Sequence, residues 1–418
     1  MAATKGTFAK LLAGACATLG VAATPSRASE VDTAALAYVE PDRVKALEMV
    51  IAANHDLGDG LLGRIKFVYD ALTGASANGA VPVYDAVQTF TRPSGRGTYR
   101  IQPGDTPLDD TFRDARGALS AGLTKPLGRL TKLDFGVYGS GEHDYTSLGA
   151  NAALSRDFQK RNRTVSLALS VNKDTISPEG GRPIPFAEML SPSQTPQRLD
   201  GDGSKTVLDG ILGVSQVIDR STVVQVNYSV SVADGYQTDP YKVVSVVDPV
   251  TGLPTAQLYE HRPDKRTKHI VYGLLKRHLS RDVVELSYRF MSDDWGVTSH
   301  TADARYRLQL GGDPGTYLQP HLRWYRQEAA DSYTPWLLDG ETLPEFATAD
   351  YRLGPMTAWT YGMKFGRPVG ENRRVTFRLE YYRQTPDNPA DAPGQLAQVD
   401  LLPPVSAVFA QVGFTTEF

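Results

Sequence analysis

The chain closes on Val405-Ser-Ala-Val-Phe-Ala-Gln-Val-Gly-Phe-Thr-Thr-Glu-Phe418, and the alternation in this stretch decides the fold. One parity is mostly apolar and the other mostly polar, a period of two that is typical of a strand with one buried and one solvated face. The apolar parity comprises Val408, Ala410, Val412, Phe414, Thr416 and Phe418. Bacterial outer-membrane barrels end on such a strand because an open sheet edge cannot exist in lipid. The stretch therefore predicts a barrel-closing strand, with Val412, Phe414 and Phe418 as the signal for the barrel-assembly machinery.

Segments with the same alternation recur from about residue 33 to the end of the chain. The clearest are 165–172, 224–232, 284–290, 302–310 and 374–383. In the last of these, Val375, Phe377, Leu379 and Tyr381 alternate with Arg374, Thr376, Arg378, Glu380 and Tyr382. Each segment is close to the length of roughly 9–11 residues that a tilted strand needs to cross a bilayer. We therefore expect a series of membrane-spanning strands.

The connections between these segments alternate in length. Short connections rich in turn-forming residues fall near 55–60, 125–129, 159–163, 219–221, 279–281, 311–315 and 368–372. Longer polar connections fall at 73–110, 175–204, 234–264, 329–354 and 385–403, and connections of medium length at 140–146 and 292–299. Short periplasmic turns and long outer loops are typical of outer-membrane barrels. We predict an all-β fold, a single transmembrane antiparallel barrel of about sixteen strands (range about 14–18), beginning with 33–40 and 44–54, with both termini in the periplasm.

The other end of the chain resembles a secretory signal peptide. Lys5 and Lys10 precede the apolar run 11–23, which is too short to span a bilayer as a helix, and Ser26-Arg-Ala28 is a small-x-small cleavage site. We expect removal of residues 1–28 and a single barrel domain over 29–418. Lipidation at Cys16 is a weaker alternative, because Ala13 stands where a lipoprotein signal has leucine. With ordinary cleavage no cysteine remains, which excludes disulfides and thiolate metal sites.

Composition adds two bounds on the class of protein. The chain has 44 Lys+Arg and 47 Asp+Glu, and we expect no nucleic-acid partner because no concentrated basic face is present. Mean hydropathy is −0.30, a value typical of soluble proteins. A large barrel also has such a value, since every second strand residue faces a wet lumen.

Aromatic residues gather where the expected strands meet the loops. The examples are Tyr69, Tyr138, Tyr145, Tyr236, Trp295, Tyr325 and Tyr382. At a bilayer interface such rings keep an apolar body in lipid and a polar tip in water, so they predict an interfacial girdle. The alternative is a set of scattered aromatic residues packed inside a β-fold.

Several segments resemble the bacterial DUF3570 family. They are Tyr69-Asp-Ala-Leu-Thr-Gly-Ala-Ser-Ala-Asn-Gly79, Ser155-Arg-Asp-Phe158, Glu260-His-Arg-Pro263, Asp293-Asp-Trp-Gly-Val-Thr-Ser-His300, Tyr325-Arg-Gln-Glu-Ala-Ala-Asp-Ser-Tyr333 and Ala349-Asp-Tyr-Arg-Leu-Gly354. The resemblance implies a Gram-negative protein with outer-membrane barrel character, and it brings no mapped catalytic residues. It also implies neighbouring genes for a small lipoprotein, a thioredoxin-like protein and a flavin-transferring enzyme, and hence envelope redox or export partners.

Two clusters at the loop edges are candidates for an outer-rim site. They are Glu142, His143 and Asp144 in one loop, and Asp293, Asp294 and His300 around another. Carboxylates and imidazoles together suit a divalent cation. We favour the alternative that these side chains are solvated and that Asp293-Asp-Trp-Gly296 forms a turn with an interfacial Trp, and so we expect no metal and no cofactor.

A hydrolase site is a further alternative for the same region. Ser299 and His300 are adjacent, but neighbouring residues on a strand point to opposite faces, so they cannot act together as nucleophile and base. The chain has no Gly-x-Ser-x-Gly nucleophile elbow. We therefore expect that the protein is not an enzyme.

The polar parity of the late strands predicts a charged lumen. The candidates that line it are Glu285, Arg289, Arg305, Arg307, Arg323, Arg374, Arg378 and Glu380. Opposed rows of Arg and acid create a transverse field that sets ion preference in a pore. A sealed interior of paired charges is the alternative, but about sixteen strands normally enclose water unless a loop fills the space. The loop 73–110 is long enough to fold inward as a constriction or to cover the mouth.

These patterns favour a channel or export conduit for small solutes in the outer membrane of a Gram-negative envelope. A structural or docking barrel that recruits envelope partners stays open as a different class, and an outer-membrane enzyme is third. Lipid and the barrel-assembly machinery are the partners that every one of these alternatives requires.

Overall fold

We describe a computed structural model that covers residues 29–418 apart from 42, 93–96, 191–193, 195–197, 312–314, 390 and 403. The expected signal peptide, residues 1–28, lies outside the described residues. Within the described part of the chain, no helix is long and apolar enough to cross a membrane.

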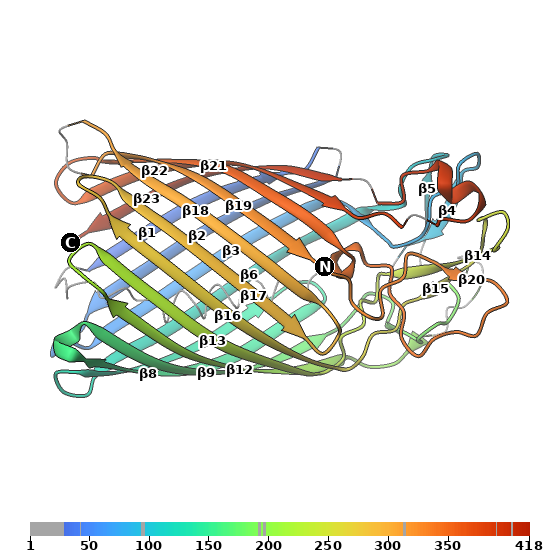
Figure 1. Ribbon diagram of the computed structural model, residues 1–418. Coiled ribbons are helices and arrows are strands. Elements are labelled where there is room, and N and C mark those ends of the chain that lie inside the picture. The colour runs from blue at the N-terminus through green and yellow to red at the C-terminus, as the bar shows by residue number, and fades with distance from the viewer. Residues whose placement is uncertain are drawn as a thin grey trace.

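Sixteen antiparallel strands form a closed barrel (Figure 1). In order around the wall they are β1 (Glu30–Val39), β2 (Val44–Asp56), β3 (Leu62–Ala77), β6 (Leu108–Pro126), β7 (Thr131–Gly141), β8 (Tyr145–Phe158), β9 (Arg163–Ile176), β12 (Gly203–Val217), β13 (Thr222–Gly235), β16 (Lys265–His278), β17 (Val283–Asp293), β18 (Thr298–Gln309), β19 (Tyr317–Gln327), β21 (Met356–Pro368), β22 (Arg373–Pro386) and β23 (Val405–Glu417). Strands β1 and β23 pair from Glu30↔Glu417 to Val39↔Val408, which closes the sheet. The predicted fold class and strand number are confirmed.

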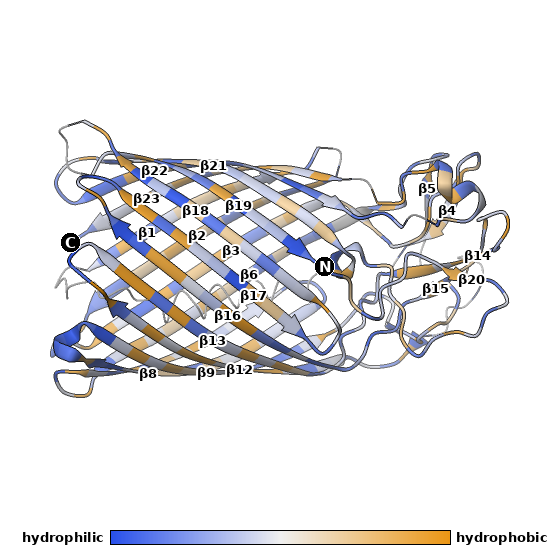
Figure 2. Ribbon diagram, in the orientation of Figure 1, coloured by the Kyte–Doolittle hydropathy of each residue, from blue (hydrophilic) through white to orange (hydrophobic). Residues whose placement is uncertain are grey.

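Apolar and polar residues alternate along the strands of this wall (Figure 2), which places them on opposite faces. In β23, Val408, Val412 and Phe414 are 42%, 49% and 38% exposed, while Ala407 on the other parity is fully buried. The same parity holds in β22, where Phe377 and Leu379 are exposed. A continuous belt of exposed apolar side chains is stable only against lipid, so the outer face of the barrel is its membrane face.

Turns and loops segregate to opposite ends of the barrel (Figure 1). The end that holds Phe418 carries short connections, such as the one between Asp56 of β2 and Leu62 of β3. There Gly58 and Gly60 adopt φ of 93° and 76°, and Asp56 accepts a hydrogen bond from the Gly58 amide at 2.9 Å. The Phe418 amide donates to the Ser29 carbonyl at 2.7 Å, so both ends of the described chain lie at this end.

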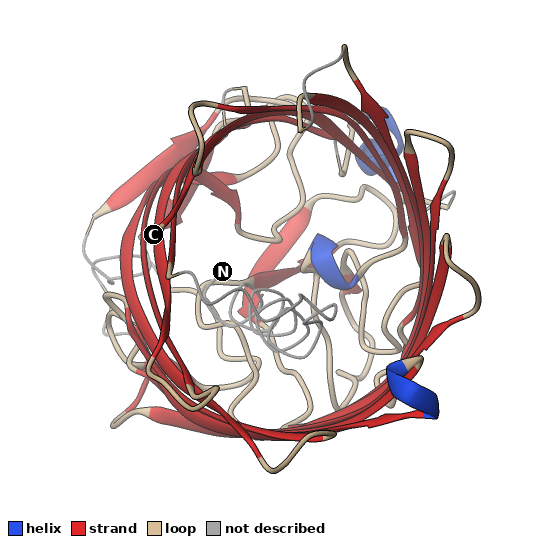
Figure 3. Ribbon diagram, turned by 90° about the vertical axis from the view of Figure 1, so that its left-hand side faces the viewer, coloured by secondary structure: helices blue, strands red, loops and turns tan. Residues whose placement is uncertain are grey.

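The long connections form a structured body over the other end, which we call the loop cap (residues 78–107, 177–202, 236–264, 328–355 and 387–404, where described). Its elements are β4 (Gln88–Thr91), β5 (Thr98–Ile101), β10 (Arg182–Pro183), β11 (Arg198–Leu199), β14 (Val243–Val247), β15 (Pro254–Tyr259), β20 (Leu337–Leu338), η2 (Tyr351–Leu353) and η3 (Gly394–Gln398). Val243, Val244 and Ala347 are fully buried there, so the cap has a core of its own. Viewed from the short-turn end, cap segments lie across the far opening of a nearly circular wall (Figure 3).

The predicted aromatic girdle is wrong for most of the residues named for it. Tyr69 is 40% exposed on the outer face, but Tyr145 and Trp295 are only 4% and 5% exposed. Tyr325 and Tyr382 lie on the inner parity of their strands, as does Tyr138, and Tyr236 packs in the cap beside Gly203. Because side chains alternate between the two faces of a strand, a shift of one residue turns an aromatic ring from the lipid to the interior. The position of an aromatic residue near the end of a strand therefore does not show that it faces lipid.

Candidate functional site

The inner face of β16, β17, β18, β19, β21 and β22 carries an excess of basic side chains, and we call it the charged wall. Its basic residues are Arg266, Lys268, Lys276, Arg289, Arg305, Arg307, Arg323, Lys364, Arg374 and Arg378, and its acids are Glu285, Asp293, Asp303 and Glu380. All eight lumen candidates from the sequence lie on this face. The alternation of the strands places them there, because inner-face residues alternate with outward-facing apolar residues along each strand.

A continuous chain of ion pairs crosses the middle of the charged wall. Arg305 Nη1 donates to Glu285 Oε1 at 2.9 Å, and its Nε lies 3.3 Å from Asp303 Oδ1. His321 bridges the two sides of the chain, with Nε2 2.8 Å from Asp303 Oδ2 and Nδ1 2.9 Å from Glu380 Oε1. At its ends, Lys276 lies 3.7 Å from Glu285 and Arg378 lies 3.9 Å from Glu380.

Gly362 makes the last step of this chain possible. His321 pairs with Gly362 in the β19–β21 register, and Gly362 pairs with Glu380 in the β21–β22 register. A Cβ at position 362 would come within 2.8 Å of Glu380 Cγ. Glu380 therefore reaches His321 across the bare backbone of β21, and any larger residue would push its carboxylate away.

Two further arginines of the charged wall lie near the short-turn end. The Arg307 guanidinium stacks over the ring of Tyr317, with Cζ 3.8 Å from the ring centroid. Arg374 Nη2 is 3.8 Å from Glu417 Oε1, and both side chains are 44% exposed. Neither contact neutralises its arginine strongly, since a stacked or solvent-exposed cation keeps its charge available to ions in the lumen.

The inner face on the opposite side of the barrel carries slightly more acidic than basic residues. On the inner faces of β2, β3, β6, β7, β8 and β9 the charged residues are Glu48, Asp70, Asp114, Asp134, Asp157 and Asp174 against Arg64, Lys66, Arg116 and Lys132. Pairs form here too, with Arg116 Nη2 2.7 Å from Asp70 Oδ2 and Arg64 Nη2 3.0 Å from Asp134 Oδ1. The slight acidic excess faces a basic wall, which is the arrangement that creates a transverse field.

The first outer-rim cluster is a group of carboxylates at the β7–β8 turn. Glu142 and Asp144 lie with Asp114 so that one oxygen from each is within 4.8 Å of the others. Burial, followed by the hydrogen bond and charge of Asp114, raises the pKa of Glu142 to about 8. Tyr241 donates to Asp144 Oδ2 at 2.5 Å, and His143 is exposed. Protonation of Glu142 accounts for this close approach of carboxylates.

The second outer-rim cluster holds a turn together. Arg266 Nε donates to Asp293 Oδ2 at 2.7 Å, and Asp293 Oδ1 accepts from the amides of Trp295 and Val297. Asp294 accepts from the Thr267 amide at 2.8 Å. The buried Trp295 lies under the Arg266 guanidinium, with Cζ 4.4 Å from its ring, so the expected turn is present but its Trp is not at the lipid interface.

His300 and Ser299 point to opposite sides of the wall. Ser299 is 6% exposed on the inner face, whereas His300 lies on the outer parity with Nδ1 2.6 Å from the Tyr288 hydroxyl. The two rim clusters are also far apart along the wall, because β8, β9, β12, β13, β16 and β17 lie between them. The structure therefore does not bring the six outer-rim candidates into one site.

Sequence reasoning missed a buried ionic network in the loop cap, which we call the cap network. Arg262 Nη2 donates to Glu260 Oε2 at 2.9 Å and to Asp350 Oδ2 at 2.8 Å. Arg352 Nε donates to Asp350 Oδ1 at 2.7 Å, and its Nη2 donates to Asp239 Oδ2 at 2.8 Å. Burial alone would raise the pKa of Asp350, but Arg352 and Arg262 hold that pKa well below its ordinary value.

The cap network is built from two of the quoted sequence segments, Glu260–Pro263 and Ala349–Gly354. Each combines an acid and an arginine two residues apart, and the Glu260 carboxylate also accepts from Thr348 Oγ1 at 2.5 Å. That spacing in two polar loops was the signal available in the sequence. It did not reveal the network, because the two segments lie about ninety residues apart in the chain and meet only in the folded cap.

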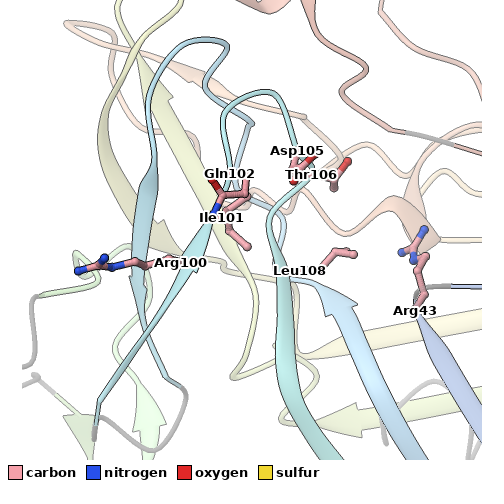
Figure 4. A pocket seen from close by; sticks show the side chains of 7 residues that line it. All are labelled: Arg43, Arg100, Ile101, Gln102, Asp105, Thr106 and Leu108. Atoms are coloured by element: carbon pink, nitrogen blue, oxygen red, sulfur yellow. The ribbon is translucent and has the colours of Figure 1, made fainter.

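A small hollow lies at the edge of the cap (Figure 4). It has a volume of about 300 Å³ between residues 100–108 and Arg43, which follows β1. Arg43 Nε is 3.6 Å from Glu40 Oε2, and the Arg43 guanidinium lies 5.8 Å from the ring of Tyr351. In Figure 4 the Arg100 side chain points away from Arg43, so the two cations do not converge on one ligand position.

Comparisons with known proteins give a family and a set of distant barrel structures. The family model described as "Protein of unknown function (DUF3570)" matches residues 8–416. No curated protein matches the sequence. The fold is similar to the "Bacterial polysaccharide outer membrane secretin", with a TM-score of 0.47 at 9% identity over 94% of this chain and 99% of that one.

Two other solved structures have similar values. For "CdiB from Acinetobacter baumannii" the TM-score is 0.44 at 8% identity, over 92% of this chain and 60% of that one. For "Pseudomonas aeruginosa OccK2 (OpdF) in complex with glucuronate" it is 0.42 at 9% identity, over 94% and 98%.

Proposed function

This chain belongs to the DUF3570 family, described as proteins of unknown function, and from that premise we propose that it is an outer-membrane channel through which small solutes pass. The observation that carries the proposal is the charged wall inside a closed barrel of sixteen strands. Barrels of about sixteen strands enclose an aqueous lumen. Arg305 is 41% exposed and Glu285 23% exposed on that wall, which supports contact with lumen water.

The architecture supports the cellular location within the same proposal. Closed antiparallel barrels with an apolar outer belt, short turns at one end and long loops at the other are typical of bacterial outer membranes. On this basis the short turns and both ends of the described chain face the periplasm, and the loop cap faces outward. Cleavage of residues 1–28 and insertion by the barrel-assembly machinery through Phe418 belong to the same proposal.

The test is single-channel recording from the folded barrel in a planar lipid bilayer. Discrete current steps with a reproducible ion preference are the expected result. A barrel that inserts and runs as a folded species on a gel, yet passes no current, would contradict the proposal. Deletion of residues 239–260 from the cap provides a useful comparison, because a larger current in that variant would assign any low conductance to the cap and not to the barrel.

A docking barrel is a second candidate, and the cap network favours it. Loops that only cover the opening of the barrel do not need a buried network of ion pairs to hold their conformation. A surface that binds a partner gains affinity when its conformation is fixed before binding. The partners would be envelope proteins such as a small lipoprotein or redox protein. Cross-linking of the full barrel in envelopes tests this: a specific cross-linked partner that the cap deletion abolishes supports docking, and its absence alongside measurable current supports the channel. The absence of enzymatic activity stays a prediction.

A further inference from the structure

We propose that Arg289 and Arg323 together form a binding site for an oxyanion group, a carboxylate or a phosphate, on a solute inside the lumen. The inference rests on the proposed function, because it names the chemical class of solute that a lumen of this kind would take. It concerns two residues of the charged wall whose charges the ion-pair chain does not use.

The two arginines lie on the same face at the middle of the barrel wall. Arg289 pairs with Thr301 in the β17–β18 register, and Arg323 pairs with Asp303 in the β18–β19 register. The two positions are therefore separated by one strand and by two residues along it. Both belong to the inner parity, so both side chains project from the same face of the wall. Two like charges at this separation repel each other, and an anion between them would relieve the repulsion.

No carboxylate is free to neutralise this pair. Among the residues that the structure describes, neither Arg289 nor Arg323 makes an ion pair or a side-chain hydrogen bond. Asp303, the acid opposite Arg323, is already held by Arg305 at 3.3 Å and by His321 at 2.8 Å. Asp293, which follows Arg289 on β17 toward the cap, forms an ion pair with Arg266. Asp303 also feels the charge of Arg323, but its oxygens are engaged by Arg305 and His321, so neither arginine of the pair has a carboxylate of its own.

Besides Asp303, the residues of neighbouring strands that share this face include uncharged polar side chains. Thr301 and Thr360 are 8% and 9% exposed on the inner face. Tyr325 donates its hydroxyl to Gln327 Oε1 at 2.6 Å, and Tyr382 donates to Gln384 Oε1 at 2.9 Å. Both phenol hydroxyls therefore donate to glutamines of their own strands. The pair is half-buried, which weakens screening by bulk water while leaving access from the lumen.

The chemistry of the guanidinium selects the ligand. Each guanidinium presents planar N–H donors that match the two oxygens of a carboxylate or phosphate, and the charge persists at any pH the envelope experiences. Two such groups facing one lumen position favour an oxyanion over a halide, because a halide cannot accept parallel hydrogen bonds from a planar fork. We therefore expect the solute to be a small acid that carries one such group.

Binding to the folded barrel in detergent tests the proposal without using conductance. Calorimetric titration with sodium phosphate and, separately, with disodium succinate at low ionic strength distinguishes the two kinds of oxyanion. We expect saturable binding of at least one of them, weakened at least tenfold in Arg289→Gln with Arg323→Gln. The matched control is Arg307→Gln with Arg374→Gln, which removes the same charge from the same wall near the short-turn end and should leave the affinity within about twofold.

Three results would overturn the proposal. These are no saturable binding of either anion by the wild-type barrel, unchanged binding in Arg289→Gln with Arg323→Gln, and equal loss in the control variant, which would show that only the overall charge of the wall matters. Gel mobility of the folded species checks that each variant retains the barrel. A barrel that binds the anion at Arg289 and Arg323 but passes no current would preserve the site and reject the channel. A barrel that passes current but shows no saturable anion binding would support the channel and reject the binding site.

Discussion

The cap network and the charged wall use the same chemistry in opposite surroundings. In the cap, the side chains of Arg262 and Asp350 are 6% and 1% exposed, and their carboxylate and guanidinium groups meet at 2.8 Å. On the charged wall, Arg305 and Glu285 meet at nearly the same distance, 2.9 Å, but are 41% and 23% exposed. Distance alone therefore does not separate these two pairs, whereas their exposure to water does.

The difference in exposure changes the consequence of losing a partner. A charge left alone in a dry network loses both its partner and its hydration, while a charge at the edge of a wet lumen regains water. We therefore expect the cap network to fix loop conformation and, under the proposed function, the charged wall to keep its charges available to ions. The following variants test this contrast, from the largest expected effect to the smallest.

Arg262→Met should have the largest effect, because it leaves Glu260 without its ion-pair partner inside the cap and removes one of the two arginines that hold Asp350. We expect the cap to lose about 3–5 kcal/mol of local stability, the usual result of removing one partner of a buried ion pair. Hydrogen exchange should then rise in 236–264 and 328–355 while β1–β3 remain protected. Unchanged protection of the cap loops would show that the network is not their scaffold.

Asp303→Asn should have a smaller effect on stability and a clear effect on ion preference. The variant removes the acceptor that Arg305 and His321 share. The Asp303 side chain is 11% exposed, compared with 1% for Asp350 in the cap network, so we expect a smaller loss of about 1–2 kcal/mol in urea unfolding of the barrel. Because the wall loses a negative charge, its preference for anions should increase in reversal-potential measurements. A loss as large as that of Arg262→Met would erase the distinction between the two networks.

Glu142→Gln should have a pH-dependent effect at the rim between cap and wall. The folded state holds the pKa of Glu142 at about 8, above its ordinary 4.5, so folding takes up a proton between these values. Stability from this group is therefore greatest below about pH 4.5 and falls as the pH rises through 8. The variant should be more stable than wild type by on the order of 1 kcal/mol at pH 9, after allowance for solvent screening, and nearly equal to it at pH 4. An equal difference at both pH values would contradict the assignment.

Lys265→Met should have the smallest effect and serves as the control for the series. Lys265 and Asp234 form an ion pair at 3.2 Å, but their side chains are 75% and 60% exposed. Exposed pairs contribute about 0–1 kcal/mol, so urea unfolding of the barrel should shift by less than about 0.5 kcal/mol. A large shift would mean that exposure is not what separates the cap network from the surface pairs.

The barrel itself was predictable from the sequence, and the reason is local. A period of two in 374–383 or 405–418 fixes which face meets lipid, and turn residues such as Gly58 mark where the chain reverses. The same parity placed Arg305 and Glu380 on one inner face. It did not reveal that His321 joins them, because that contact depends on Gly362 leaving room across β21.

The loop cap and the aromatic positions were not predictable in the same way. Loops have no period, so Glu260 and Asp350 gave no sign that they share Arg262. Tyr325 and Tyr382 lay where strands meet loops, but position along a strand does not determine the face on which a ring lies. Trp295 was expected in the interface, and the guanidinium of Arg266 instead covers it inside the wall.

The most direct test of the central claim is the reversal potential of the folded barrel across a salt gradient, with wild type compared with Arg305→Glu with Arg307→Glu. If the charged wall lines a solute path, the wild-type barrel conducts and the variant shifts toward cations, because two positive charges on the wall become negative. A conducting barrel whose reversal potential ignores this change, or a folded and inserted barrel that passes no current, would contradict it.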